Sequence, residues 1–171
     1  MLFKKLVLAA CAFGSLTSAH AGGGAKPFLI ISDIDDTIKI TNVLDKDKAV
    51  ENGLFGDRTF LGMAELYQEL ASNGGMKAAP VVYMSGSPPI LLGEIRKMLV
   101  GGHKFPDGNF RLRDWLKTKD VYSFKSAGML ALHAIFAKSK TVFVELGDDT
   151  ERDMDVYHDY IKAHPGKTAA A

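Results

Sequence analysis

Three short apolar runs, each followed by polar side chains, constrain the fold of this 171-residue chain more than any other feature. They cover residues 28–32, 80–84 and 141–146. All are rich in β-branched or aromatic residues and are typical of buried strands. Segments with helical spacing of apolar residues lie between and after them, at 60–70, 90–99, 129–136 and 156–161. This alternation predicts βαβ units, and therefore an α/β fold with a Rossmann-like, mostly parallel sheet.

A further strand is predicted at residues 121–124 (VYSF), since the run is β-branched and aromatic. The helix that follows is then expected to start at residues 126–128 (SAG). Lys125 stands directly before this expected helix start.

The polar residues that end the runs are expected to meet at one edge of the sheet. Asp33 and Asp35 follow the first run, Ser85 the second and residues 147–149 (GDD) the third. In a parallel sheet the carboxyl ends of all strands lie along the same edge, where α/β proteins bind ligands. Asp33 and Asp35 project to the same side of an extended chain, and a cation between them would keep both carboxylates ionised.

This set of residues has the composition that phosphoryl transfer requires. Asp33 is the candidate nucleophile, and Asp35 is the candidate general acid and later the base that activates water. Ser85 and the Gly86 amide are candidates to donate to phosphoryl oxygens, and Lys125 is a candidate positive charge beside them. Ser85 to Pro88 also fits an ordinary strand-to-helix turn, with Ser87 as the N-cap.

A magnesium site is expected from the same acids, because Mg²⁺ prefers oxygen ligands. Its candidate ligands are the Asp33 carboxylate, the Asp35 backbone carbonyl and Asp148, together with either Asp149 or Asp153. Asp153 has a second interpretation, because Thr150-x-x-Asp153 also resembles the capping box of the last helix.

The ordered motifs resemble those of the haloacid dehalogenase (HAD) superfamily. They are Asp33-x-Asp35-x-Thr37, Ser85, Lys125 and residues 147–153 (GDDTERD). Most members of that superfamily are magnesium-dependent phosphotransferases, chiefly phosphatases. The resemblance implies a three-layer, HAD-like fold with helices on both faces of the sheet and a small or absent cap.

A narrower set of motifs is similar to the catalytic domain of actin-patch-type phosphatidate phosphatases, which convert phosphatidic acid to diacylglycerol. The similar segments are residues 32–41 (SDIDDTIKIT), 62–67 (GMAELY), 85–88 (SGSP) and 105–108 (FPDG). Two departures stand out: that family usually has Gly-Asp-Ser-Gly where this chain has GDDT, and it continues into another strand where this chain ends.

Substrate contacts are expected outside the motifs. Arg111 and Arg113 are candidates to bind a phosphate or a headgroup, or are exposed arginines without such a role. Residues 52–57 (NGLFGD) place two apolar side chains where the superfamily carries a cap. This segment covers the site, contacts a lipid surface, or is an ordinary turn packed into the core.

Composition indicates a single globular domain over residues 22–171. The chain has 21 Lys and Arg against 20 Asp and Glu, and 47% of its residues are hydrophobic. The basic residues are spread along the chain, so no nucleic-acid footprint is present. The expected partner is a phosphate-ester substrate, with a membrane lipid as one candidate, and no stable protein partner is inferred.

Residues 1–21 are typical of a secretory signal peptide. Lys4 and Lys5 precede an apolar segment at 6–16, and residues 18–21 (SAHA) supply small residues for cleavage after Ala21. The protein is therefore expected to be periplasmic or secreted. Lipidation of Cys11, the only cysteine, is a minor alternative.

Taken together, the sequence predicts a magnesium-dependent phosphatase that works through an aspartyl-phosphate. The family resemblance alone makes phosphatidate the leading substrate. The alternatives are a phosphatase for a small soluble phosphate ester and a non-catalytic module that binds a cation or phosphate.

Overall fold

The structure is a computed structural model that describes residues 26–41, 57–72 and 79–171. The predicted signal peptide at 1–21, with Cys11, and residues 52–56 of the candidate cap segment lie outside the described residues. Export of the protein therefore stays a prediction.

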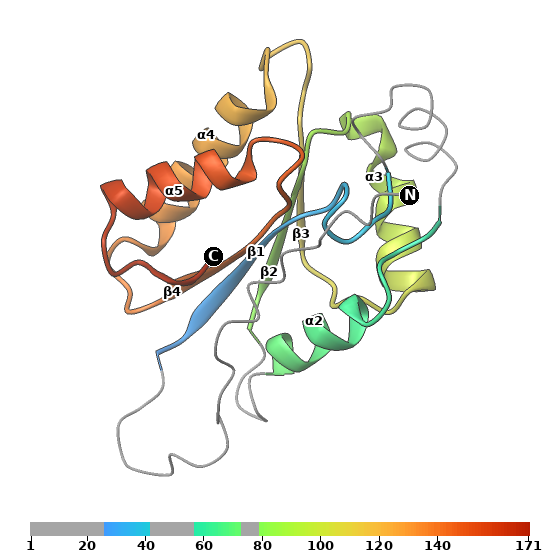
Figure 1. The fold of residues 1–171 in the computed structure, drawn as a ribbon, viewed down its shortest axis with the longest axis horizontal. Coiled ribbons are helices and arrows are strands. Elements are labelled where there is room, and N and C mark those ends of the chain that lie inside the picture. Colours follow the sequence, from blue (N-terminus) through green and yellow to red (C-terminus); the bar gives the residue numbers. More distant parts are fainter. Residues whose placement is uncertain (1–25, 42–56, 73–78) are drawn as a thin grey trace, which may run out of the picture.

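A five-stranded parallel sheet forms the centre of the molecule, in the order β3-β2-β1-β4-β5 (Figure 1). Its strands are β1 (Phe28–Asp33), β2 (Val81–Ser85), β3 (Asn109–Leu112), β4 (Val142–Leu146) and β5 (Thr168–Ala170). The central strand β1 pairs with β2 on one side and β4 on the other, and Ile30 is aligned with both Val81 and Val144. The predicted α/β fold with a parallel sheet is confirmed.

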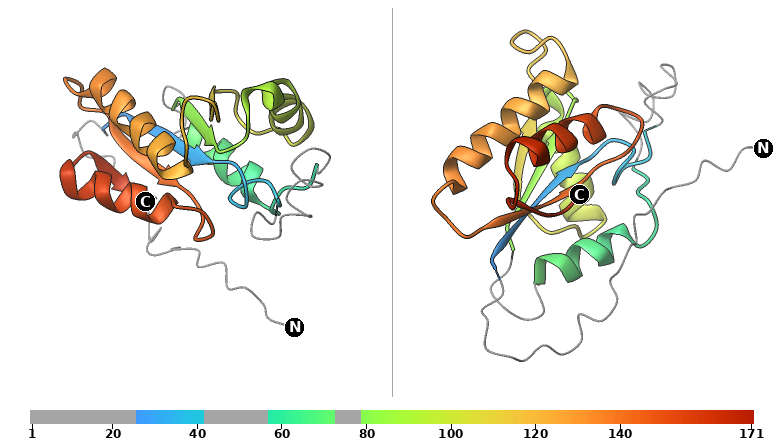
Figure 2. Two further views of the ribbon diagram at one scale, coloured as in Figure 1. Left: turned by 90° about the horizontal axis from the view of Figure 1, so that it is seen from above. Right: turned by 60° about the vertical axis from the view of Figure 1, so that its left-hand side comes forward.

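Helices cover both faces of this sheet, which gives three layers (Figures 1 and 2). They are α2 (Met63–Ser72), α3 (Leu92–Arg96), α4 (Val121–Phe136) and α5 (Asp153–Ala163). A 3₁₀ turn at Pro89–Leu91 and a π-helical segment at Lys97–Gly102 extend α3 at its two ends. Figure 2 shows α4 and α5 on one side of the sheet and α2 and α3 on the other.

The core is divided by β1 into two clusters, because successive side chains of a strand point to opposite faces. Ile30 packs with Tyr67 and Leu99 on the side of α2 and α3. Leu29 and Ile31 belong to the second cluster, on the side of α4 and α5. Because both faces of β1 are covered, its first four residues, 28–31, are all apolar.

The predicted strand at residues 121–124 is wrong, because this segment is the first turn of α4. Asp120 is the N-cap of that helix, and its carboxylate accepts hydrogen bonds from the Ser123 backbone N–H and hydroxyl, both at 2.8 Å. Tyr122 and Phe124 pack against the second core cluster. Cap chemistry and packing thus overcome the β propensity of the run, and Lys125 lies within the helix instead of before it.

The expectation that the chain ends before a last strand is also wrong. Residues 168–170 form β5, which pairs parallel with β4, and the Phe143 N–H donates to the Lys167 carbonyl at 2.7 Å. Neither β5 nor β3 is predicted from the sequence. Both are short edge strands without a clear alternation of apolar and polar residues, so the neighbouring strand decides their conformation.

Glu145 is a buried carboxylate in β4, and it is not part of the predicted site. Its Oε1 accepts a hydrogen bond from the Thr168 hydroxyl at 3.0 Å, which ties β5 to β4. Its Oε2 has no partner among the described residues. Burial raises the pKa of Glu145 to about 7, although the Thr168 hydrogen bond acts in the opposite direction.

We expect Glu145→Gln to stabilise the protein at pH 8 by roughly 1–2 kcal/mol and to have no effect near pH 4.5. Because the pKa is higher in the folded than in the unfolded state, the glutamate destabilises the fold above pH 7. This penalty disappears as the pH falls from about 7 toward the ordinary value of 4.5. Urea unfolding of both proteins at the two pH values measures the difference. A variant that is no more stable than the parent at pH 8 would contradict the prediction.

Candidate active site

A tight turn after β1 positions the two acids of the first motif. Asp36 has a φ of 57°, a left-handed conformation that a short polar side chain tolerates. Its backbone N–H donates to the Lys39 carbonyl at 2.7 Å, and its Oδ1 accepts from the Thr41 N–H at 2.9 Å. The turn therefore fixes the backbone directly after Asp33 and Asp35.

Lys125 joins three carboxylates at the carboxyl edge of the sheet. Its side chain is fully buried, and its Nζ donates to Asp33 Oδ1 and Asp153 Oδ1, both at 2.6 Å, and to Glu151 Oε2 at 3.2 Å. Burial alone would lower the pKa of Lys125, but the three carboxylates outweigh this effect and raise it. The ammonium group is therefore charged at neutral pH.

One lysine does not balance the negative charge of this cluster. Burial raises the pKa of Asp33 well above its usual range; Lys125 acts in the opposite direction, while the Asp153 and Asp35 charges raise it further. Burial also raises the pKa of Asp153 against the effect of Lys125. The cluster thus favours a further positive charge beside the lysine.

A candidate metal centre lies at the same place. Asp33, Asp148 and Asp153 each offer a carboxylate oxygen, and these oxygens lie within 4.8 Å of one another. The Oδ2 atoms of Asp33 and Asp153 are buried and have no hydrogen-bond partner among the described residues. Unpartnered carboxylate oxygens in an all-oxygen group fit a hard divalent cation such as Mg²⁺ or Ca²⁺.

The structure distinguishes the two acids that the sequence left open for this centre. Asp153 is buried and belongs to the group, whereas Asp149 is exposed and lies outside it. Asp148 is held in place because its Oδ1 accepts from the Thr150 N–H at 2.6 Å, the Thr150 hydroxyl at 2.7 Å and the Glu151 N–H at 3.0 Å.

The capping box that was the alternative role of Asp153 is not formed. Arg152 holds the N-cap position of α5 and makes no side-chain capping bond. The Thr150 hydroxyl donates to Asp148, and the Asp153 carboxylate pairs with Lys125. Neither side chain caps the start of α5.

Asp35 faces the loop after β2. Its Oδ2 accepts from the Ser85 hydroxyl at 2.7 Å and the Ser87 hydroxyl at 3.3 Å, and the Ser87 N–H donates to Ser85 Oγ at 2.9 Å. Ser87 is therefore not the predicted N-cap; Pro88 takes that position without a side-chain bond. The Asp35 carboxylate is not part of the metal group, which leaves it available for proton transfer.

The two candidate arginines bind backbone carbonyls. Arg111 Nη1 donates to the Gly128 carbonyl at 3.2 Å. The Arg113 backbone N–H donates to the Ser85 and Ser87 carbonyls, both at 3.1 Å. Its side-chain Nε donates to the Gly86 carbonyl at 3.4 Å. Arg113 therefore positions the loop that carries Ser85 and Gly86.

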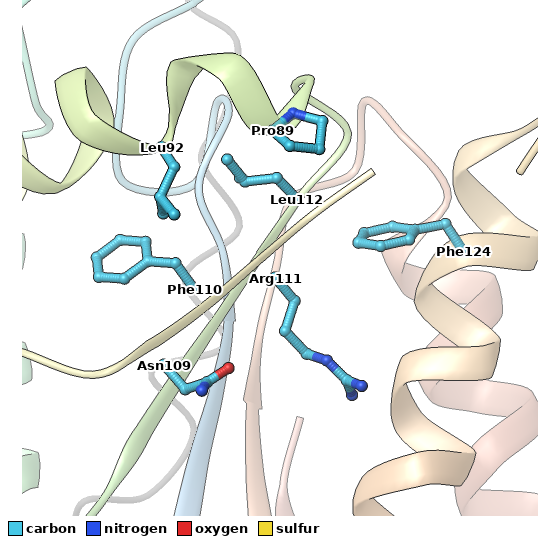
Figure 3. Close-up of a pocket in the computed structure, with 7 residues that line it drawn as sticks. All are labelled: Pro89, Leu92, Asn109, Phe110, Arg111, Leu112 and Phe124. Carbon is cyan, nitrogen blue, oxygen red and sulfur yellow. The ribbon is translucent and has the colours of Figure 1, made fainter. Parts of the chain in front are cut away.

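An open pocket of about 480 Å³ lies along the edge strand β3 (Figure 3). Its lining residues are Pro89, Leu92, Asn109, Phe110, Arg111, Leu112 and Phe124. None of the clustered acids lines it, so this pocket is not the place of the proposed chemistry.

Two residues of the site were missed by sequence reasoning. Glu151 is the third carboxylate on Lys125, and it has no distinctive spacing within the motif at 147–153. Gly147 was named only as part of that motif. A Cβ at this position would lie 2.6 Å from the Cβ of Asp153, so only glycine permits this close approach.

We expect Gly147→Ala to reduce cation affinity and activity by roughly tenfold or more, because the added methyl group displaces Asp153. Isothermal titration with Mg²⁺ and a phosphatase assay measure the two effects. Gly93→Ala is a matched control, since a Cβ there meets nothing within 4 Å. Equal cation affinity in the Gly147 variant and the parent would contradict the prediction.

The fold and the cluster together define the class of protein. The sheet brings together two aspartates at the end of its first strand and a serine at the end of its second, with a helical lysine and further acids after the fourth strand. This is the architecture of a HAD-type phosphohydrolase. The sequence model of the family "Phosphatidate phosphatase APP1, catalytic domain" matches residues 28–171. The chain belongs to this family, whose description is that of a phosphatase catalytic domain.

Comparison with solved structures supports the fold alone. The structure titled "Structure of Pnkp1/Rnl/Hen1 complex" matches with a TM-score of 0.55 and 18% sequence identity, over 92% of this chain and 50% of that chain. This chain thus spans about half the length of that protein. No curated protein matches it in sequence. Among the described residues, no helix has the length and apolarity needed to cross a membrane.

Proposed function

We propose that this protein is a magnesium-dependent phosphatase that hydrolyses phosphatidate to diacylglycerol and phosphate through an aspartyl-phosphate on Asp33. The observation that supports this most strongly is the buried cluster of Asp33, Lys125 and Asp153, with unpartnered carboxylate oxygens next to Asp148. Phosphatidate is the proposed substrate because of the family to which the chain belongs.

The proposed ligands of the magnesium ion are the carboxylates of Asp33, Asp148 and Asp153, together with the backbone carbonyl of Asp35. When bound, the ion neutralises charge on the phosphoryl oxygens. Asp148 is held by Thr150 and Glu151, so its orientation does not depend on the ion.

In the first step, a carboxylate oxygen of Asp33 attacks phosphorus and the bond from phosphorus to the ester oxygen breaks. Protonated Asp35 gives its proton to that oxygen, which leaves as the alcohol. In the second step, water attacks phosphorus, Asp35 takes the proton of the water, and the bond between phosphorus and Asp33 breaks. Inorganic phosphate is released and Asp33 is free again.

The loop after β2 is proposed to bind the transferred group. Ser85 and the Gly86 amide would donate to phosphoryl oxygens, and the Lys125 ammonium would offset the developing negative charge. In this structure the Ser85 hydroxyl donates to Asp35 and Lys125 donates to Asp33, so both donors lie directly beside the reacting carboxylates. Asp33 has no exposed surface, so substrate access requires the groups around it to rearrange.

The test is phosphate release from dispersed phosphatidate and from a panel of soluble phosphate esters, with magnesium and with a chelator. Magnesium-dependent release with a preference for phosphatidate is the expected result. A preference for a soluble ester would replace the proposed substrate, and no release from the folded protein would leave a cation- or phosphate-binding module.

We expect Asp35→Asn to reduce kcat by roughly 10²–10⁴-fold while magnesium affinity changes far less, because the Asp35 carboxylate lies outside the metal group. Asparagine keeps the size of the side chain and can still accept from Ser85. Single-turnover kinetics and magnesium titration separate the two effects. A loss confined to magnesium binding would exclude the acid and base role.

A further inference from the structure

We propose that residues 113–120, the loop between β3 and α4, dock this protein on an anionic phospholipid bilayer next to the active site. This inference rests on the proposed function, since it concerns how a lipid substrate reaches that site. The segment is called the docking loop below.

The docking loop lies at the carboxyl edge of the sheet, where the proposed chemistry takes place. β3 runs parallel to β1 and β2, so the segment after its end at Leu112 emerges at the same edge as Asp33 and Ser85. Figures 1 and 2 show this yellow-to-orange connection projecting outward between the end of β3 and the start of α4.

Two large apolar side chains are exposed on this loop. Leu116 is 98% exposed and Trp115 is 59% exposed. In addition, Ile90 is 87% exposed in the turn after β2, at the same edge of the sheet. Large exposed apolar side chains at one edge of the sheet are typical of an interaction surface.

The exposure of Leu116 belongs to a structured turn. The Leu116 N–H donates to Asp114 Oδ1 at 3.0 Å, and the Lys117 and Thr118 N–H groups donate to the Asp114 carbonyl at 3.0 and 2.9 Å. Arg113 Nη1 closes the loop by donating to the Lys119 carbonyl at 3.1 Å. The loop thus holds its leucine outward in a defined conformation.

Trp115 has the properties of a residue at a membrane interface. Its indole N–H donates to the Gly86 carbonyl at 2.8 Å, and the remainder of its ring is half exposed. The Arg113 guanidinium lies over the ring, 5.6 Å from its centre. An aromatic ring with one hydrogen-bonded polar edge and an apolar exposed body is favoured at the boundary between lipid and water.

The charges of the loop suit an anionic surface. Arg113, Lys117 and Lys119 are basic, against the two acids Asp114 and Asp120. Asp114 is paired with Lys117 at 2.9 Å, and Asp120 is used as the N-cap of α4. Exposed apolar side chains next to lysine and arginine are the combination by which peripheral proteins bind anionic lipids.

The loop is also connected directly to the proposed phosphate-binding turn. The Gly86 carbonyl accepts from both Arg113 and Trp115, so the same segment contacts lipid and holds the backbone beside Ser85. Docking would therefore place the headgroup of a membrane lipid close to Gly86 and Asp33.

Trp115 is the only tryptophan of the chain, so its fluorescence reports on this loop without labelling. We expect vesicles of phosphatidylcholine with phosphatidate to shift its emission to shorter wavelength and lipids with brominated acyl chains to quench it. Vesicles of phosphatidylcholine alone should bind at least several-fold more weakly. No shift at saturating lipid, or equal binding to both vesicles, would overturn the proposal.

Leu116→Ser should weaken vesicle binding by roughly tenfold or more, because it removes the most exposed apolar side chain of the loop. Ile135→Ser is the matched control: Ile135 is 71% exposed but lies near the end of α4, away from the docking loop. Equal loss of vesicle binding in both variants, or no loss in Leu116→Ser, would overturn the assignment of the docking loop.

Binding and catalysis are separated by a second pair of measurements. Vesicle binding is measured with Asp33→Asn, so it does not depend on turnover. Leu116→Ser should raise the KM for vesicle phosphatidate and leave kcat/KM for a soluble phosphate ester unchanged. Absence of all phosphatase activity together with normal vesicle binding would reject the proposed function and keep the docking surface.

Discussion

Asp33→Asn is expected to abolish phosphate release, by roughly 10³-fold or more, while the protein remains folded. Asp33 is the proposed nucleophile, and an amide cannot form the aspartyl-phosphate. The fold should tolerate the change because Lys125 keeps Asp153 and Glu151 as partners after Asp33 loses its charge. Steady-state kinetics with phosphatidate and a soluble ester measure the loss of activity, and urea unfolding measures the stability of the variant.

Asp149→Asn is the control for this experiment. Asp149 is exposed and lies outside the acidic group, so its variant should retain most of the activity. Turnover that persists in Asp33→Asn would remove the nucleophile assignment. If Asp149→Asn loses as much activity as Asp33→Asn, then Asp153 is not the second metal-binding acid of the last motif.

Lys125→Met is expected to destabilise the protein by about 3–5 kcal/mol at pH 7 and to abolish activity as well. The substitution leaves Asp33 and Asp153 buried without their common cation. The pKa of Lys125 is raised in the folded state, so its contribution is fully present below the ordinary lysine value of 10.5. Urea unfolding at pH 7 measures the loss.

The pH dependence of this variant provides a second test. The pKa values of Asp33 and Asp153 are raised by burial even beside Lys125, so without it their ionised forms are disfavoured further. The deficit of the variant should therefore shrink as the pH is lowered from 7 toward 5. Lys138→Met, at an exposed lysine, is the control and should have little effect. A constant deficit would show that lost packing, and not unpaired charge, causes the instability.

These two predictions concern the same atoms, since the cluster serves both stability and the proposed chemistry. Lys125 links α4 to β1 and to the first residue of α5. A cation at the neighbouring oxygens of Asp33 and Asp153 would add to that link. Magnesium is therefore expected to stabilise the protein as well as to activate it.

The central strands and the order of the motifs follow from local patterns in the sequence. Residues 28–31 are apolar without interruption because both faces of β1 are covered, and that pattern is local. Because parallel strands end at one edge of the sheet, the sequence also predicted that Asp33, Ser85 and Asp148 come from neighbouring strand ends. The family resemblance followed from those same positions.

The side chains that meet in the site depend on how distant segments of the chain pack together. Asp149 and Asp153 are equivalent in sequence terms, but the start of α5 buries Asp153 against Lys125 and leaves Asp149 exposed. Residues 121–124 have strand propensity and form a helix because Asp120 caps it. The short strands β3 and β5 depend on pairing with β2 and β4. For Asp153 and the edge strands the deciding energy comes from partners distant in sequence, which a local pattern does not encode. The Asp120 cap is a local signal that competes with the β propensity of residues 121–124.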